Sequence, residues 1–300
     1  MLAEEELPPR KRRPPLTWLY VPADRPDRVL KAMASSADVV IVDLEDAVAV
    51  RSKDRARDAA ATALEGRDQG PVDGRPPVAR QLPVQVRVNH PRSSWGSQDL
   101  AMVRGLPEWV GVRLPKCESP DEVVEVAHLV GPRPLHLLVE SALGVERAFA
   151  LAGSHPRVAS IGLGEADLRA DLGVTGDEGL LWSRGRLVSA SVAAGLGPPS
   201  MSVHPDIRDV AGLLASCRVG RALGFLGRTA IHPDQLDPIR EAFAPTAPEL
   251  ARAREVLAAA AAGAARGVGA LVLADGRFVD EAVVRQARRV VALVDDPADG

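Results

Sequence analysis

The sequence has few of the features that mark secreted, membrane-bound or nucleic-acid-binding proteins. Its two cysteines, Cys117 and Cys217, give neither a disulfide framework nor a metal-ligand spacing, so we expect a reducing cytoplasmic location. No apolar run is long enough to cross a membrane, and residues 1–15 lack the apolar stretch of a signal peptide. The net charge of −3 and a pI near 6.1 argue against a general nucleic-acid binder. We therefore expect neither a membrane nor a nucleic-acid partner.

Motifs of nucleotide-binding proteins and of common hydrolases are also missing. The segment "GLGEAD" (162–167) begins like a dinucleotide-binding fingerprint, but Asp167 stands where the third glycine belongs, and the segment follows a late apolar run. The chain has no lysine-bearing phosphate loop and no G-x-S-x-G nucleophile elbow. His204 and His232 are neither at helical spacing nor close to cysteines, which argues against zinc.

Eight short apolar runs, rich in Val, Ile and Leu, alternate with helical patterns. Most runs are almost continuously apolar, as strands covered on both faces should be. This alternation predicts a parallel sheet closed as a (β/α)8 TIM barrel, with an open doubly wound sheet as the alternative. The runs span residues 16–23, 38–46, 83–89, 109–116, 135–141, 158–165, 198–206 and 225–233.

The remaining sequence divides the chain into parts. Ser119 followed by Pro120 predicts the start of a helix, and residues 65–81 predict a surface loop. Beyond the eighth run, helical patterns surround a predicted hairpin turn at "ADG" (274–276). We expect a disordered tail, a TIM-barrel catalytic domain and a C-terminal helical extension, at residues 1–15, 16–245 and 246–300 respectively.

Polar residues recur at the carboxyl ends of the predicted strands, where barrel enzymes place their functional groups. Glu140 closes an apolar strand, a poor place for a lone carboxylate, and Asp167 follows one strand–helix unit later. Two such carboxylates can hold Mg²⁺, which leaves its other positions to water and substrate. The alternative for Glu140 is an exposed position at the rim. The other residues of this kind are Asp43, Glu45, Asp46, Arg87, Asn89, Lys116, Glu165, His204, Asp206, His232 and Asp234.

Arg87 is the only charged residue inside the run "VQVRVN". A guanidinium at such a position needs an anionic partner from the protein or from a ligand. Its planar fork suits a substrate carboxylate. The alternative is a structural ion pair with Asp43 or Glu45, and the two interpretations are compatible.

The glycines of "SIGLGEADLRADLG" (160–173) follow the sixth predicted strand. Gly164 leaves space for a ligand to approach the backbone. Of the three acids that come next, Asp167 is the candidate metal ligand. Glu165 is at most a supporting residue, and Asp171 is expected in the helix that follows.

Taken together, the motifs resemble those of the citrate lyase β-subunit family within the HpcH/HpaI aldolase group. The resemblance runs from about residue 16 to 292 and keeps the order of the motifs. Three positions depart from it: Ala23-Asp24 in "VPADRP", Leu143 where an arginine is common, and "EAVV" after Asp280. The matching segments are "LYVPADRPDRVLKAMASSADVVIVDLEDAV", "VRVN", "LPKCES", "LLVESALGV", "GEADLRADLG", "DIRD", "ALGFLGRTAIHPDQL" and "GRFVDEAVVRQAR".

This resemblance implies a TIM-barrel enzyme that uses Mg²⁺ to cleave or form carbon–carbon bonds in acyl-CoA or acyl-carrier thioesters. By position, Glu140 and Asp167 would hold the metal, and Arg87 would bind the carboxylate of a keto acid. Asp280 would be a catalytic base donated by a neighbouring subunit, which implies a homo-oligomer, usually a trimer. The substrate-binding region would then include Arg87, Asp43, Glu45, Lys116, Gly164 and Glu165.

The hypothesis is a retro-Claisen cleavage of a 3-hydroxyacyl-CoA, such as malyl-CoA, citramalyl-CoA or methylmalyl-CoA, into a keto acid and an acyl-CoA. Lys116 either stabilises the enolate or pairs with Asp43. Three alternatives stay open: a citryl-acyl-carrier lyase subunit, a CoA-independent hydroxy-keto-acid aldolase, and a non-catalytic scaffold on the same fold. The "GRFVD" segment (276–280) argues against the second, and the set of Arg87, Glu140 and Asp167 argues against the third.

Overall fold

A computed structural model describes residues 13–65, 82–265, 270–273 and 275–294. The predicted disordered tail lies mostly outside these residues, and the predicted loop at 65–81 almost entirely so. The chain forms two compact units, one of residues 15–243 and one that begins at Ala244. Each unit is described by itself.

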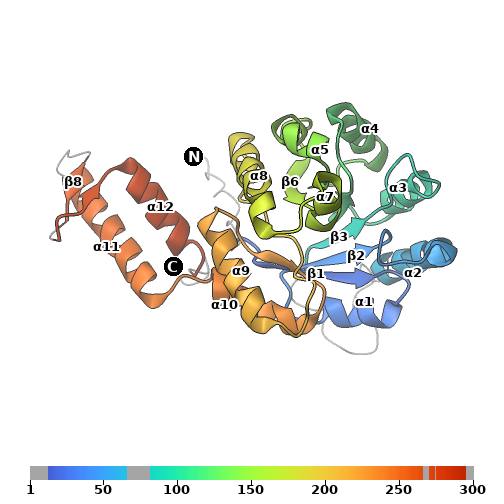
Figure 1. Cartoon of the computed structure of the whole chain (residues 1–300), viewed down its shortest axis with the longest axis horizontal. Coiled ribbons are helices and arrows are strands. Elements are labelled where there is room, and N and C mark those ends of the chain that lie inside the picture. The colour runs from blue at the N-terminus through green and yellow to red at the C-terminus, as the bar shows by residue number, and fades with distance from the viewer. Residues whose placement is uncertain (1–12, 66–81, 266–269, 274, 295–300) are drawn as a thin grey trace, which may run out of the picture. The chain divides into compact units, whose positions relative to one another are not determined.

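The first unit is built on a seven-stranded, fully parallel sheet with the order β6-β5-β4-β3-β2-β1-β7. Consecutive strands pair side by side from β1 to β6, as the alternation of strands and helices predicts for a TIM-barrel-like α/β fold. Helices surround these strands (Figure 1). The strands are β1 (Thr17–Pro22), β2 (Val39–Asp43), β3 (Val84–Arg87), β4 (Val110–Leu114), β5 (Leu135–Val139), β6 (Val158–Leu163) and β7 (Arg228–Ala230).

The seventh predicted strand, at 198–206, does not form a regular strand in the structure. It makes a single parallel bridge between Met201 and Arg228. Met201 accepts a backbone hydrogen bond from Thr229 and donates one to Gly227, each at 3.0 Å. Prolines cause the difference: residues 198, 199 and 205 are all Pro, and a proline has no N–H to donate to a strand ladder.

Apolar side chains from the strands form the core of this unit. Every residue of β2 and of β4 is buried, because these central strands are covered on both faces. Ser119 caps α4 by accepting a hydrogen bond from the Glu122 N–H, with Pro120 as the first helical residue, as predicted. The segment 144–153 forms two short helices where one was expected. The helices are α1 (Pro26–Met33), α2 (Lys53–Glu65), α3 (Gly96–Gly105), α4 (Pro120–Val130), α5 (Ala142–Glu146), α6 (Ala148–Ala152), α7 (Glu165–Leu172), α8 (Leu181–Ala193), α9 (Val210–Ala222) and α10 (Leu236–Phe243).

The second unit is a helical hairpin with a small two-stranded sheet. Thr246 and Glu249 form a capping box that starts α11. The predicted hairpin and final helix are present, and Gly276 takes the positive φ that its turn requires. A small apolar core joins the helices. The elements are α11 (Ala247–Ala264), β8 (Leu271–Val272), β9 (Phe278–Val279) and α12 (Glu281–Val291).

Within the described residues, none of the helices combines the length and the apolar character that a membrane crossing requires.

Candidate active site

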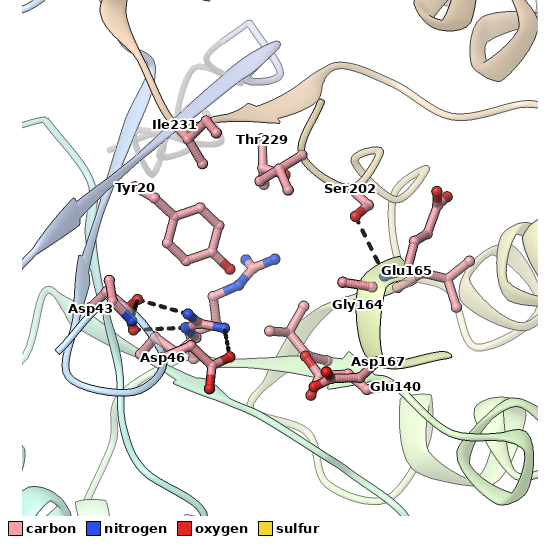
Figure 2. Close-up of a pocket in the computed structure, with 17 residues that line it drawn as sticks. Tyr20, Asp43, Asp46, Glu140, Gly164, Glu165, Asp167, Ser202, Thr229 and Ile231 are labelled. Carbon is pink, nitrogen blue, oxygen red and sulfur yellow. Dashed lines mark hydrogen bonds and ion pairs between the residues drawn. The ribbon is translucent and has the colours of Figure 1, made fainter. Parts of the chain in front are cut away.

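A cavity of about 380 Å³ opens at the carboxyl ends of the strands in the first unit. It collects side chains from β1, β2, β3, β4 and β5, from the start of α7, and from the segments around Ser202 and Ile231 (Figure 2). Parallel strands that point the same way bring residues far apart in sequence to one edge of the sheet. Its lining includes Tyr20, Asp43, Asp46, Arg87, Arg113, Leu138, Glu140, Gly164, Glu165, Asp167, Ser202 and Thr229.

One side of the cavity is a network of paired charges at the ends of β2 and β3. Arg87 donates two hydrogen bonds of 2.7 Å to the carboxylate of Asp43, and its Nη1 lies 2.9 Å from Glu45 Oε2. Burial by itself lowers the pKa of Arg87. The hydrogen bonds and the charge of Asp43 raise it by more, so the pKa of Arg87 is above its ordinary value. The structural ion pair that the sequence left open for Arg87 is therefore present.

Lys116 joins the same network. Its Nζ lies 2.6 Å from Glu45 Oε1 and 3.8 Å from Asp167 Oδ2. Of the two alternatives left open for Lys116, pairing with Asp43 is wrong: Arg87 contacts both oxygens of Asp43, and Lys116 pairs with Glu45. Lys116 has a φ of 53°, in the left-handed region that L-residues other than glycine seldom adopt.

Glu140 lies on the opposite side of the cavity, where no lysine or arginine of the described residues forms an ion pair with it; Arg87 and Lys116 act on it only from a greater distance. The residue is 6% exposed, and its buried Oε2 has no hydrogen-bond partner among the residues that the structure describes. Burial and the charge of Glu45 raise the pKa of Glu140 to about 7. The alternative of an exposed rim position is wrong, because the side chain is enclosed. A buried carboxylate oxygen without a donor is a position that a cation can satisfy.

Gly164 makes the position of Glu140 possible. A Cβ at Gly164 would overlap the Glu140 carboxylate, so the residue at 164 must be glycine for Glu140 to keep this place. The space that the glycine was expected to leave for a ligand is taken, in this region, by a protein carboxylate. Gly164 therefore shapes the candidate metal site through Glu140.

Asp167 completes the second side of the cavity from the first turn of α7. Its side chain is 51% exposed, and Figure 2 shows it next to Glu140. No group of three or more His, Cys, Asp or Glu side chains with metal-binding geometry occurs among the described residues. One buried and one exposed carboxylate fit Mg²⁺, which keeps several waters or substrate oxygens as ligands. The donor set therefore fits this metal.

The other two acids of the same segment have structural partners. Glu165 accepts hydrogen bonds of 2.8 and 2.7 Å from Arg184 of α8, and Figure 2 shows its carboxylate directed away from Glu140. Asp171 lies in α7, as expected, and accepts a hydrogen bond of 2.7 Å from the Ala142 N–H. Glu165 thus supports the cavity wall through Arg184.

Asp280 belongs to the second unit. It is the N-cap of α12, and its carboxylate accepts a 3.0 Å hydrogen bond from the Val283 N–H. This cap fixes the start of the final helix. Within the described residues Asp280 therefore caps a helix. The prediction that it acts as a catalytic base in a neighbouring subunit stays a prediction.

Sequence reasoning missed several residues of the cavity, among them an aromatic residue and a second arginine. Tyr20 of β1 lies close to two guanidinium groups, with its ring centroid 5.0 Å from Cζ of Arg87 and 5.7 Å from Cζ of Arg113. Arg113 of β4 is 4% exposed. A signal for Arg113 existed: it is a charged residue inside the apolar run "WVGVRLPK", the same argument that selected Arg87.

The fold and the site define a class: α/β-barrel proteins with a carboxylate-lined, metal-compatible cavity at the strand ends. Residues 16–233 match the HpcH/HpaI aldolase/citrate lyase family, and the chain belongs to this family.

Individual relatives span almost the whole chain. Citrate lyase subunit beta of Escherichia coli K12 is 34% identical over 94% of each chain. (3S)-malyl-CoA thioesterase of Cereibacter sphaeroides is 33% identical over 91% of this chain and 92% of the relative. The crystal structure of CitE from Mycobacterium tuberculosis, in complex with magnesium, acetoacetate and coenzyme A, is similar with a TM-score of 0.75. It is 34% identical and covers 94% of this chain and 98% of its own.

Proposed function

We propose that this protein is a Mg²⁺-dependent carbon–carbon lyase that cleaves, or in reverse forms, a 3-hydroxyacyl-CoA thioester, giving a keto acid and an acyl-CoA. The observation that carries the proposal is the buried carboxylate of Glu140, whose Oε2 has no partner, beside Asp167 in a cavity that also contains arginine. The relatives named for citrate lyase and malyl-CoA support the substrate class, and the magnesium and coenzyme A complex supports the cofactor.

Glu140 and Asp167 would hold the metal. Bound there, Mg²⁺ supplies Lewis-acid chemistry to the carboxylate and hydroxyl oxygens of the substrate. Arg87 positions the carboxylate of the keto-acid portion. Its contact with the exposed Asp46, at 3.4 Å, is the one that a substrate carboxylate can replace without breaking the Asp43 pair.

The reaction needs a base and an acceptor for negative charge. The base takes the hydroxyl proton, the carbon–carbon bond breaks, and its electron pair moves onto the carbon next to the thioester as the keto acid forms. Asp280 of a neighbouring subunit is our candidate for the base. Lys116, whose side chain is 45% exposed, lies next to Glu45 and Asp167 and would face the developing enolate.

This assignment of Asp280 requires a homo-oligomer, for which we propose a trimer acting in the cytoplasm. Light scattering on the purified protein tests the trimer. Mixing a Glu140→Gln protein with an Asp280→Asn protein tests the donation, because a shared site regains activity in mixed trimers and a site within one chain does not.

A carrier-bound citryl group is the second candidate substrate, favoured by the similarity to citrate lyase subunit beta over 94% of both chains. The two candidates share the chemistry and differ in the thiol that carries the acyl group. Comparing cleavage rates of a CoA thioester and of the same acyl group on an acyl-carrier protein distinguishes them.

The decisive experiment measures Mg²⁺ binding and lyase activity together. We expect Glu140→Gln and Asp167→Asn to weaken Mg²⁺ binding in calorimetry and to lower Mg²⁺-dependent kcat/KM by at least about 100-fold, because the metal contributes several kcal/mol to the transition state. Glu125→Gln, on the exposed face of α4, is the matched control and should leave both quantities unchanged. Full activity in either test variant would refute the metal assignment.

A further inference from the structure

The cavity contains a second arginine, Arg113, whose surroundings differ from those of Arg87. Arg113 is on β4, is 4% exposed, and lines the cavity. Gly162 of the next strand but one leaves room for its head group, since a Cβ there would lie 3.6 Å from Nη2, an ordinary contact. The guanidinium is therefore held inside the barrel, at the base of the site.

The contacts that Arg113 makes with described residues are with uncharged groups. Nη1 donates a 3.0 Å hydrogen bond to Gln85 Oε1, and the ring of Tyr20 lies 5.7 Å from Cζ. The buried Nε has no hydrogen-bond partner within the described ranges of the chain. Burial and the charge of Arg113 lower the pKa of His136 to about 3, so this neighbouring imidazole is neutral. Among the described residues, no carboxylate lies within ion-pairing distance of Arg113.

An arginine always carries its charge, and a buried charge without an anion is strongly unfavourable. Arg87 meets this requirement through Asp43 and Glu45. Arg113 does not, although it lines a cavity that a ligand can enter. An anionic group of the ligand would supply the missing counter-charge, together with an acceptor for Nε.

We propose that Arg113 binds a second carboxylate of the substrate and so makes the site selective for thioesters whose keto-acid product is a dicarboxylate. This proposal rests on the function proposed above. Arg87 and the Glu140–Asp167 site act on the carboxylate next to the reacting carbon. The ring of Tyr20 lies near both guanidinium groups, so a short dicarboxylate can bridge them: their Cζ atoms are no further apart than the sum of 5.0 and 5.7 Å.

The depth of Arg113 excludes the other anionic part of the substrate. The phosphates of coenzyme A are at the far end of a long, flexible arm from the thioester and stay near solvent. A side chain that is 4% exposed, inside a cavity of about 380 Å³, meets the small acyl end. The acyl group is therefore where the second carboxylate must be.

The test uses two substrates that differ by this carboxylate alone. Citryl-CoA releases oxaloacetate and citramalyl-CoA releases pyruvate, so a carboxymethyl group replaces a methyl group. We expect the wild-type protein to prefer citryl-CoA. Arg113→Met should lower kcat/KM for citryl-CoA by roughly 10- to 100-fold and for citramalyl-CoA by less than about threefold, because one charge-assisted contact is lost. Arg113→Lys should fall between the two proteins, since it keeps the charge and loses the fork.

Two further measurements separate this role from a structural one. Arg104→Met, at an exposed position of α3, is the matched control and should change neither substrate. The Tm of Arg113→Met should be equal to or above that of the wild type, because an apolar side chain removes an unpaired buried charge. Equal losses on both substrates, or no loss on either, would overturn the proposal.

Calorimetric binding of oxaloacetate and pyruvate in the presence of Mg²⁺ separates this inference from the proposed lyase function. Oxaloacetate binding that depends on Arg113, in a wild-type protein that cleaves neither thioester, would refute the lyase and keep the inference. If the wild-type protein cleaves the thioesters and Arg113→Met leaves its preference for citryl-CoA unchanged, the lyase function is supported and the inference about Arg113 is refuted.

Discussion

The two sides of the cavity differ in whether their buried carboxylates are paired with cations. At the ends of β2 and β3, Asp43 and Glu45 are buried and each contacts a cation at 2.9 Å or less. Across the cavity, Glu140 is also buried, but within the described parts of the chain its Oε2 has neither a hydrogen bond nor an ion pair, whereas Glu45 Oε2 has the ion pair with Arg87. Both sides come from the same kind of strand end, so the fold alone does not explain the difference.

The difference separates charges that hold the structure from charges that await a ligand. A paired buried carboxylate is satisfied by the protein and is costly to disturb. An unpaired buried carboxylate destabilises the folded protein locally, and a bound cation can offset this cost. Burial raises the pKa of both acids, that of Glu140 to about 7 and that of Glu45 in the same direction, and the charges of Arg87 and Lys116 oppose the rise at each; Glu45 alone adds a hydrogen bond from Lys116.

The largest expected effect comes from breaking the paired side. Asp43→Ala removes the partner of two Arg87 hydrogen bonds and leaves the backbone N–H groups of Glu45 and Ala47 without their acceptor. We expect the free energy of unfolding at pH 7 to fall by about 3–5 kcal/mol, as when one partner of a buried pair is lost. Urea denaturation measures it.

The matched variant for this comparison is Glu140→Gln on the unpaired side. It removes a buried charge that has no cation, so the metal-free protein should be as stable as the wild type or more stable. A loss of more than about 2 kcal/mol in Glu140→Gln, or of less than about 1 kcal/mol in Asp43→Ala, would contradict the division between the two sides.

Much of the fold was predictable from sequence, because near-continuous apolar runs report strands that are buried on both faces. The run at 198–206 does not form a regular strand because it contains three prolines. A prediction based on apolar content alone does not take these prolines into account. The capped start of α4 at Ser119 was predictable because both signals, Ser and then Pro, act on the backbone next to them.

Most of the acidic residues of the site were predictable from sequence, but their pairings and the second arginine were not. Strand ends placed Glu140 and Asp167 in one region, but only three-dimensional distances show which acids have cations. Glu165 pairs with Arg184, which comes nineteen residues later on another helix, so no local pattern announces the pair. The unpaired state of Arg113 likewise depends on what is absent around it in space.

A change of pH should have a smaller effect than these substitutions, and the effect should come from the unpaired acid Glu140. The pKa of Glu140 is about 7 in the folded protein against an ordinary 4.5. A raised pKa of a carboxyl group means that the folded state holds its proton more tightly, so metal-free stability falls as pH rises from about 4.5 through 7. Mg²⁺ must displace that proton, and its affinity should therefore rise about tenfold between pH 6 and pH 8.

Calorimetry in buffers of different ionisation enthalpy counts the released protons. We expect close to one proton released per Mg²⁺ bound at pH 6 and close to none at pH 8. A Mg²⁺ affinity that is independent of pH over this range would mean that Glu140 is not a ligand.

The smallest expected effect belongs to Lys116, which lies between the two sides. Its side chain is 45% exposed, and it contacts Glu45 at 2.6 Å and Asp167 at 3.8 Å. Exposed ion pairs contribute little, so Lys116→Met should lower the free energy of unfolding by less than about 1 kcal/mol. Mg²⁺ affinity should rise about two- to fivefold, because a positive charge close to Asp167 is removed. Denaturation and calorimetry measure the two quantities. A loss of stability near that of Asp43→Ala would place Lys116 among the structural charges, and weaker Mg²⁺ binding would show that it orients Asp167 and does not compete for it.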